Sequence, residues 1–175
     1  MAAIDLILLG MLKREPLSAY DMQKLVEYRN ISKWVKISTP SVYKKALQLE
    51  ERGFIKGETV KEGRMPEKAV YTLTEAGERE FARLMLEIST QPVRIFLDMN
   101  AVIVNLDGLP AVERRECLNR IGENVLALLA CQEEELGRKA QDPSVPQTGL
   151  AVLRQQLALT RAIEAWLEEL WEQYS

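Results

Sequence analysis

The stretch TPSVYKKALQLEERGFI, residues 39–55, contains the signals of a whole helix followed by the start of a strand. Thr39 suits the N-cap, Pro40 the first helical position and Gly53 the position just past the end, so a helix is predicted over 40–52. At about 100° per residue, the side chains divide between two faces. The apolar face holds Val42, Tyr43, Ala46, Leu47 and Leu49, and the polar, cationic face holds Ser41, Lys44, Lys45, Gln48 and Arg52.

Two helices are predicted before this stretch. Residues 3–14 form a nearly all-apolar helix, and residues from an N-cap at Ser18 to about Glu27 form the second, with Asp21 completing a capping-box pattern. The run IDLILLGML has no preceding basic residue and is too short to span a membrane, so we interpret it as a buried helix of a cytoplasmic protein. The stretch NISKWVKIS, residues 30–38, fits either a loop or a short strand.

A hairpin and another helix are predicted after the stretch. FIKGETV, residues 54–60, and KAVYTLT, residues 68–74, are strand-like, and the segment EGRMPE between them is typical of a turn. Thr74 caps the next helix, whose apolar residues recur at i, i+3, i+4 and i+7; they are Phe81, Leu84, Met85 and Ile88. Three helices, a hairpin and a further helix are the order of a winged helix-turn-helix, in which the third helix enters the major groove of DNA.

The predicted third helix supplies candidate DNA contacts. Lys44, Lys45 and Arg52 could neutralise phosphates or recognise guanine. Ser41 and Gln48 could contact the backbone or base edges. The alternative for this helix taken alone is an ordinary solvated face, and the hairpin beside it favours DNA binding.

The hairpin and two tyrosines add further candidates. Lys61, Arg64 and Lys68 surround the hairpin tip, and Arg64 beside a turn suits the minor groove. The rings of Tyr43 and Tyr20 are expected to pack in the core, with hydroxyls that could still reach a phosphate.

The back half of the chain is predicted to be all helical, over 93–106, 110–140 and 147–174, with breaks at LDGLP and QDPSVP. Its apolar stripes are wider than one small domain can cover, which indicates a dimer. The residues expected in dimerisation are Leu118, Ile121, Val125, Leu128, Leu157, Ile163, Trp166, Leu167, Leu170 and Trp171. We therefore predict a mainly α fold with a small β-hairpin, divided into a winged helix domain over 1–90 and a helical dimerisation domain over 91–175.

The composition argues against an enzyme. The chain has no histidine, which excludes histidine-based acid–base catalysis and histidine-ligated metals. Cys117 and Cys131 lie roughly 21 Å apart on one predicted helix, beyond disulfide reach. No glycine-rich phosphate loop occurs, and we predict no cofactor. Residues 1–83 carry a net charge of +3 and residues 84–175 a net charge of −6, which indicates different tasks for the two halves.

The front half resembles the PadR family of bacterial winged-helix regulators. The matching segments are LILLGMLKREPLSAYDMQKLVE, PSVYKKALQLEERGFI and EGRMPEKAVYTLTEAG, with Tyr43 in the place of the family's typical tyrosine. Ala19 replaces the usual glycine before Tyr20, and Met65 separates Arg64 from Pro66 in the wing. The back half is similar only in character to the family's helical dimerisation domain.

This resemblance implies a homodimeric, DNA-binding transcriptional regulator, a repressor on a pseudo-palindromic operator, released by a small aromatic or drug-like effector. Trp34, Trp166 and Trp171 could line such an effector's pocket or pack in the dimer interface. Two other functions stay open: a winged helix used for protein interaction, and a ligand-sensing scaffold that does not bind DNA.

Overall fold

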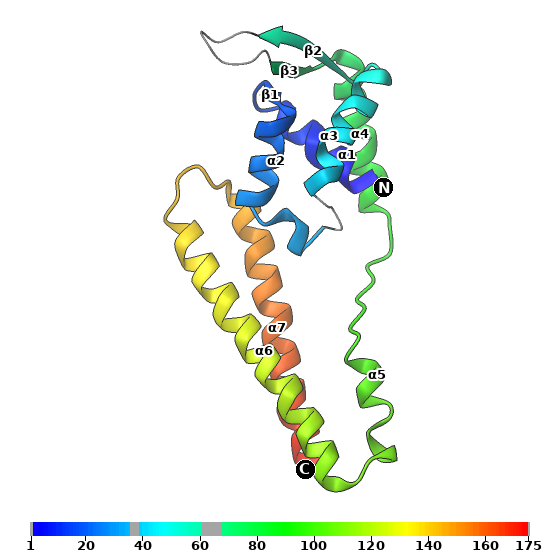
Figure 1. Cartoon of the computed structure of the whole chain (residues 1–175), viewed down its shortest axis with the longest axis vertical. Helices are drawn as coiled ribbons and strands as arrows, with labels where there is room; N and C mark the ends of the chain where they lie inside the picture. Colours follow the sequence, from blue (N-terminus) through cyan, green and yellow to red (C-terminus); the bar gives the residue numbers. More distant parts are fainter. Residues whose placement is uncertain (1, 36–38, 61–67, 175) are drawn as a thin grey trace. The chain divides into compact units, whose positions relative to one another are not determined.

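A computed structural model describes residues 2–35, 39–60 and 68–174 of the chain. The chain is mostly helical with one small antiparallel sheet, and it divides into two compact units, Met1–Val93 and Arg94–Ser175 (Figure 1). Among the described residues, no helix has both the length and the apolar character needed to cross a membrane.

The first unit has the predicted order of elements. Its helices are α1 (Ala2–Leu12), α2 (Ala19–Tyr28), α3 (Thr39–Glu51) and α4 (Glu75–Ser89), and its strands are β1 (Leu17–Ser18), β2 (Ile55–Val60) and β3 (Lys68–Leu73). The sheet has the order β1-β3-β2, with Ile55 opposite Leu73 and Val60 opposite Lys68. The two-residue strand β1 was not predicted, because it is too short to show alternation.

The segment after α2 contains a 3₁₀ helix, η1 (Ile31–Lys33), in place of the loop or short strand considered for 30–38. Residues 36–38 of that stretch, and the hairpin tip at 61–67, lie outside the described residues.

The predicted end signals at Ser18 and Gly53 are confirmed, whereas Thr39, predicted as an N-cap, is the first residue of α3. Ser18 and Asp21 form a complete capping box, in which the Asp21 N–H donates to Ser18 Oγ at 3.2 Å. Gly53 has a positive φ of 74°, the left-handed conformation that ends a helix and that glycine adopts without strain. These local signals explain why the predicted bounds of the first three helices lie close to the observed ones.

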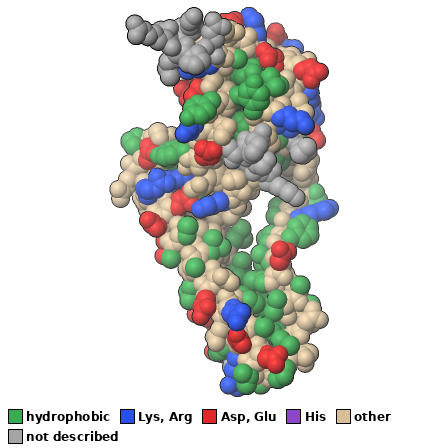
Figure 2. Space-filling view, in the orientation of Figure 1, with side chains coloured by type: hydrophobic (Ala, Val, Ile, Leu, Met, Phe, Trp, Pro, Cys, Tyr) green, Lys and Arg blue, Asp and Glu red, His purple; other side chains and the backbone are tan. Residues whose placement is uncertain are grey.

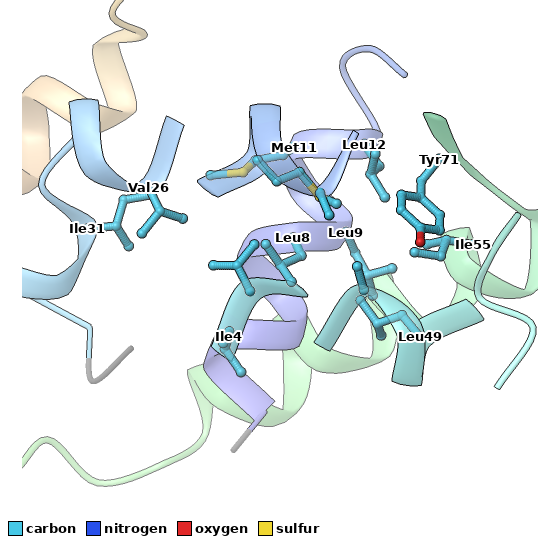
Figure 3. Packing of buried hydrophobic residues seen from close by; sticks show 14 of the residues in the cluster. Ile4, Leu8, Leu9, Met11, Leu12, Val26, Ile31, Leu49, Ile55 and Tyr71 are labelled. Carbon is cyan, nitrogen blue, oxygen red and sulfur yellow. The ribbon is translucent and has the colours of Figure 1, made fainter. Parts of the chain in front are cut away.

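One hydrophobic core holds the first unit together. Leu8 and Leu9 of α1 are fully buried, as is Met22 of α2, and α1 packs against both α3 and α4 (Figure 3). Leu49 of α3 and Ile55 of β2 extend this core to the sheet. Truncation of a side chain such as Leu49 to alanine costs about 2–5 kcal/mol in a core of this kind, so α3 is rigidly seated.

Thr74 and Gly77 join the end of α3 to the start of α4. The Thr74 side chain accepts from the Gly77 N–H at 3.1 Å, and its Oγ1 lies 2.7 Å from the carbonyl oxygen of Gly53. A Cβ atom at Gly77 would lie only 2.0 Å from the Phe54 carbonyl oxygen. Only glycine therefore fits at position 77, the third residue of α4.

The second unit contains two long helices and an irregular leading segment. Its elements are α5 (Asn100–Ile103), the 3₁₀ helix η2 (Leu106–Gly108), α6 (Ala111–Ala140) and α7 (Gln147–Tyr174). The predicted helix over 93–106 is wrong, since only α5 and η2 are helical there. Val93, Ile95 and Val104 are β-branched, which lowers helix propensity, and they stay exposed, so no packing compensates.

The helices α6 and α7 pack side by side along their length (Figure 1). Their shared core consists of Val125 and Leu129 from α6 with Leu157 and Leu167 from α7. An ion pair between Arg161 Nη2 and Glu133 Oε1, 2.7 Å apart, joins the two helices at the surface.

Candidate nucleic-acid interface

The helix α3 presents an outer face that is different from the predicted one. Tyr43 is 61% exposed and Leu47 is 44% exposed, and Lys44 and Glu51 are exposed beside them. We call these four residues the outer face of α3. Ser41 and Gln48 are half-buried at its edge. The prediction that the Tyr43 ring packs in the core is wrong, so an aromatic ring and a lysine are available to a partner.

Two of the three predicted cationic side chains pair with Asp5, although only Lys45 is withdrawn from solvent and Arg52 stays 49% exposed. Lys45 Nζ lies 2.9 Å from Asp5 Oδ1 of α1, and the Lys45 side chain is only 15% exposed. Arg52 Nη1 lies 3.5 Å from Asp5 Oδ2, and its guanidinium stacks 4.5 Å from the centre of the Phe54 ring. The predicted cationic face therefore keeps Lys44 and Arg52 exposed and loses Lys45 to an ion pair, and DNA contact by Lys45 and Arg52 stays a prediction.

The predicted and observed faces of α3 differ because Tyr43 and Leu47 are exposed although they are apolar. Buried Val42, Ala46 and Leu49 point roughly 40° away from the centre of the predicted apolar face, at 100° per residue. Treating Tyr43 and Leu47 as core residues moved that centre toward them. The periodicity of the sequence contains no sign of Asp5, which lies 40 residues from Lys45 in the chain and attracts it to α1.

The start of α2 also presents an aromatic ring. Tyr20 is 63% exposed, so the prediction that its ring packs first is wrong as well. Lys24 Nζ lies 5.3 Å from the centre of this ring, within the range of a cation–π contact. Sequence reasoning did not single out Lys24, although its position one helical turn after Tyr20 could have indicated the pair.

The hairpin is connected to α3 through Glu50. Glu50 Oε1 accepts from the Gly57 N–H of β2 at 2.9 Å. Tyr71 of β3 is buried, and this burial, with the nearby Glu50 carboxylate, raises the pKa of the Tyr71 phenol. The hydrogen bond from Gly57 to Glu50, and the position of Tyr71 near the same carboxylate, connect the hairpin to α3. The two elements can therefore meet a common partner as one surface.

The wing itself is described only in part. Lys68 begins β3 and is exposed, and Lys56 Nζ pairs with Glu58 at 2.8 Å on β2. Lys61, Arg64 and Met65 belong to the tip and lie outside the described residues. Their predicted role in DNA binding stays a prediction.

Most of the residues predicted for dimerisation pack within the helical unit. Leu118, Val125, Leu157 and Leu167 are buried in the single chain, and four more are half-buried: Ile121, Ile163, Leu170 and Trp171. Leu128 and Trp166 are exposed, and so are further apolar side chains that were not singled out: Ile95, Phe96, Val104, Val112, Leu126 and Leu159. Hydrophobic side chains are widespread over the surface of this unit in Figure 2.

Residue types that bind metals, and the three tryptophans, are the remaining candidates for ligand sites. Within residues 2–35, 39–60 and 68–174, no group of three or more cysteine and acidic side chains is placed to hold a metal ion. Trp34 is half-buried against the core of the first unit, whereas Trp166 and Trp171 belong to α7. No single described unit therefore brings the three tryptophans together.

Solved structures of other proteins share this fold over nearly the whole chain, and one family model matches its front half. The model of the transcriptional regulator PadR-like family matches residues 8–83. Among solved structures, Bacillus subtilis PadR in complex with operator DNA has a TM-score of 0.85 at 21% identity, covering 99% of each chain. The same protein in complex with p-coumaric acid has a TM-score of 0.79 at 19% identity, covering 95% of this chain and 92% of that one.

A third structure, the Vibrio cholerae virulence activator AphA, has a TM-score of 0.69 at 22% identity, covering 95% of this chain and 94% of that one. No match to a curated protein was found. At these identities the solved structures show a shared fold, a winged helix followed by long C-terminal helices.

Proposed function

Because the chain belongs, through residues 8–83, to the PadR-like family of transcriptional regulators, we propose that it is a homodimer that binds a pseudo-palindromic operator. The observation that carries the proposal is the outer face of α3, where Tyr43 and Lys44 are exposed on a rigidly seated third helix. In a winged helix this face lies in the major groove.

The contacts of the outer face divide into two kinds. Lys44 supplies a positive charge for a phosphate or a guanine, and Ser41 and Gln48 can bond to backbone or base edges. Tyr43 and Leu47 supply apolar surface, which suits the methyl group of thymine. On α2, Tyr20 lies in the first turn, a favourable place for a phosphate, and Lys24 lies one turn further along, beside the Tyr20 ring.

The exposed apolar residues of the helical unit support a second copy of the chain as partner. Leu126 and Leu128 of α6 and Trp166 of α7 are exposed in the single chain, although the two helices already pack together. Burial of these side chains between two copies would remove them from water. A two-fold dimer would set two α3 helices roughly 34 Å apart, one turn of DNA.

We assign the sign of regulation and the effector as part of the same proposal. A regulator that covers its operator acts as a repressor, and an effector that changes the spacing of the two α3 helices would release it. The fold is shared with a protein solved with p-coumaric acid, and α7 carries Trp166 and Trp171. We therefore propose a small aromatic effector bound near α7, in a cytoplasmic regulator.

Selection from a library of random DNA duplexes tests the proposal. The full-length protein should enrich a duplex with two inverted half-sites, and Lys44→Ala should reduce affinity and lower the salt slope by about one. The absence of any enriched duplex would favour the protein-interaction or ligand-sensing alternative.

Two further measurements test the proposed roles of Arg64 and of the effector separately. Arg64→Ala should weaken binding more on A·T-rich than on G·C-rich flanks if Arg64 enters the minor groove.

p-Coumaric acid, used as a probe, should change tryptophan fluorescence and lower the affinity for the enriched duplex. A change in fluorescence with unchanged DNA affinity would contradict the release mechanism.

A further inference from the structure

The helix α1 contains a buried acid among apolar side chains. Asp5 is only 8% exposed, and Ile4, Leu8 and Leu9 of the same helix belong to the core. Moving a carboxylate out of water is costly unless cations or hydrogen-bond donors compensate. A hydrophobic residue would fill this place at lower cost, so the acid calls for a specific explanation.

The two cations that approach Asp5 are Lys45 of α3 and Arg52, which directly follows α3 and whose N–H still donates to the Gln48 carbonyl oxygen. Lys45 Nζ is 2.9 Å from one carboxylate oxygen, and Arg52 Nη1 is 3.5 Å from the other. Lys45 and Arg52 are seven residues apart, two turns of helix, and so lie on the same side of α3. The Asp5 carboxylate therefore pairs with two cations that lie above one another on one side of α3.

A second acid supports the same side of α3 from α4. Arg52 Nη2 lies 3.5 Å from Glu80 Oε1, and the Glu80 side chain is only 11% exposed. Glu80 is itself held by Arg83, whose Nε and Nη2 donate to its two oxygens at 2.7 and 2.9 Å. The Arg52 guanidinium also stacks on Phe54.

We propose that Asp5 is a positioning residue that, together with the buried apolar side of α3, fixes the rotation of this helix about its axis and holds Lys45, and in part the half-exposed Arg52, away from DNA. The inference rests on the proposed function, in which α3 contacts DNA. A rotation of α3 by one residue, about 100°, would replace Lys44 by Lys45 at the outer face. The ion pairs with Asp5 oppose that rotation.

The arrangement has a consequence for specificity. Lysine and arginine bind phosphates on any DNA sequence, so each free cation on α3 strengthens non-specific binding. With Lys45 and Arg52 paired to acids, contacts by Tyr43, Lys44 and Leu47 carry a larger share of binding. Asp5 should therefore raise the ratio of specific to non-specific affinity rather than the affinity itself.

The first test compares full-length wild type with Asp5→Asn, which removes the charge and keeps the size. The probes are the duplex enriched by wild type and a duplex of the same composition with scrambled sequence. Asp5→Asn should steepen the salt slope by about one for each cation that reaches a phosphate, and should lower the affinity ratio about tenfold. Adding Lys45→Met to Asp5→Asn should remove one unit of that steepening.

The adjacent lysines supply a second test that keeps Asp5 in place. Lys44→Gln should lower the salt slope by about one, whereas Lys45→Gln should leave it unchanged, since Lys45 faces Asp5. Equal losses of slope in the two variants would show that Lys45 binds a phosphate and would overturn the inference.

The outcomes distinguish this inference from the proposed function. An enriched duplex, with a salt slope and affinity ratio that Asp5→Asn does not change, would leave the proposed function intact and reduce Asp5 to a structural residue. Failure of wild type to enrich any duplex would overturn the proposed function and this inference together. A lowered stability alone, measured by urea unfolding, would not support the positioning role.

Discussion

The two units differ in how their buried apolar side chains are arranged, although each unit also exposes some at its surface. In the first unit, α1, α2, α3, β2 and β3 all contribute side chains to one core, and residues such as Leu8 and Met22 are completely buried. In the second unit, the shared core of α6 and α7 is a narrow line, and Leu126 and Phe96 remain in water. This comparison fits the proposal that a second copy of the chain covers the second unit, whereas the core of the first unit is filled by its own elements.

Deletion of residues 147–175 should have the largest effect. Without α7, the apolar side of α6 that contains Val125 and Leu129 is uncovered, so the protein should be a monomer or aggregate. The affinity for the enriched duplex should fall about 10²- to 10⁴-fold, because two linked half-site contacts become one. Light scattering and DNA titration measure both effects, and a truncated protein that stays dimeric would place the partner surface elsewhere.

A glycine substitution in each unit sharpens the comparison. Gly77→Ala should destabilise the first unit by about 1–3 kcal/mol or more, because the new methyl group overlaps the Phe54 carbonyl. Gly122→Ala, in the interior of α6 with no atom outside its own helix backbone within 4 Å of the added carbon, should stabilise by about 0.5–1 kcal/mol. Urea unfolding of both variants checks these values, and equal effects would remove the distinction between a tight and an open site.

Exposed leucines test whether the second unit alone needs a partner. Leu126→Gln together with Leu128→Gln on α6 should weaken the dimer about tenfold without changing helix content, since both side chains are exposed in the single chain. Leu86→Gln on α4 is the matched control, because Leu86 is even more exposed but belongs to the self-sufficient unit. A dimer weakened only by the α4 substitution would reverse the comparison. Sedimentation over a range of protein concentrations measures the dissociation constant.

The smallest expected effect concerns acid stability of the first unit. The hydrogen bonds from Arg83 hold the pKa of the Glu80 carboxyl below its ordinary value of 4.5. A lowered folded-state pKa adds stability that is complete above pH 4.5 and is lost as the pH falls through the folded value. Glu80→Gln should therefore cost less than about 1 kcal/mol at pH 7 and make stability less dependent on pH below 4.5. Urea unfolding of wild type and variant at pH 7 and pH 3.5 measures this dependence. The same loss of stability at pH 3.5 in both proteins would contradict this role of Glu80.

The sequence was sufficient for the elements whose signals are local. Thr74, Ser18 with Asp21, and Gly53 mark helix ends through contacts within a few residues, and the structure confirms each one. The helix predicted over 93–106 is wrong because its apolar residues suggested packing that the single chain does not supply.

The candidate interface depends on contacts between distant residues, and there the sequence was not sufficient. Lys45 and Arg52 pair with Asp5, which lies in α1, and Arg52 also pairs with Glu80, which lies in α4. Helical periodicity places basic residues toward solvent and tyrosine or leucine toward the core, which is the reverse of what Lys45, Tyr43 and Leu47 do. The placement of Lys44 on the exposed side was correct.

The mass of the protein–DNA complex tests the central claim most directly. Full-length protein mixed with the enriched duplex, measured by light scattering after size-exclusion chromatography, should give two chains per duplex across a range of protein-to-DNA ratios. Protein alone should give the mass of two chains. One chain per duplex, or a single-chain mass for the free protein, would contradict a regulator in which the helical unit joins two copies of the DNA-binding unit.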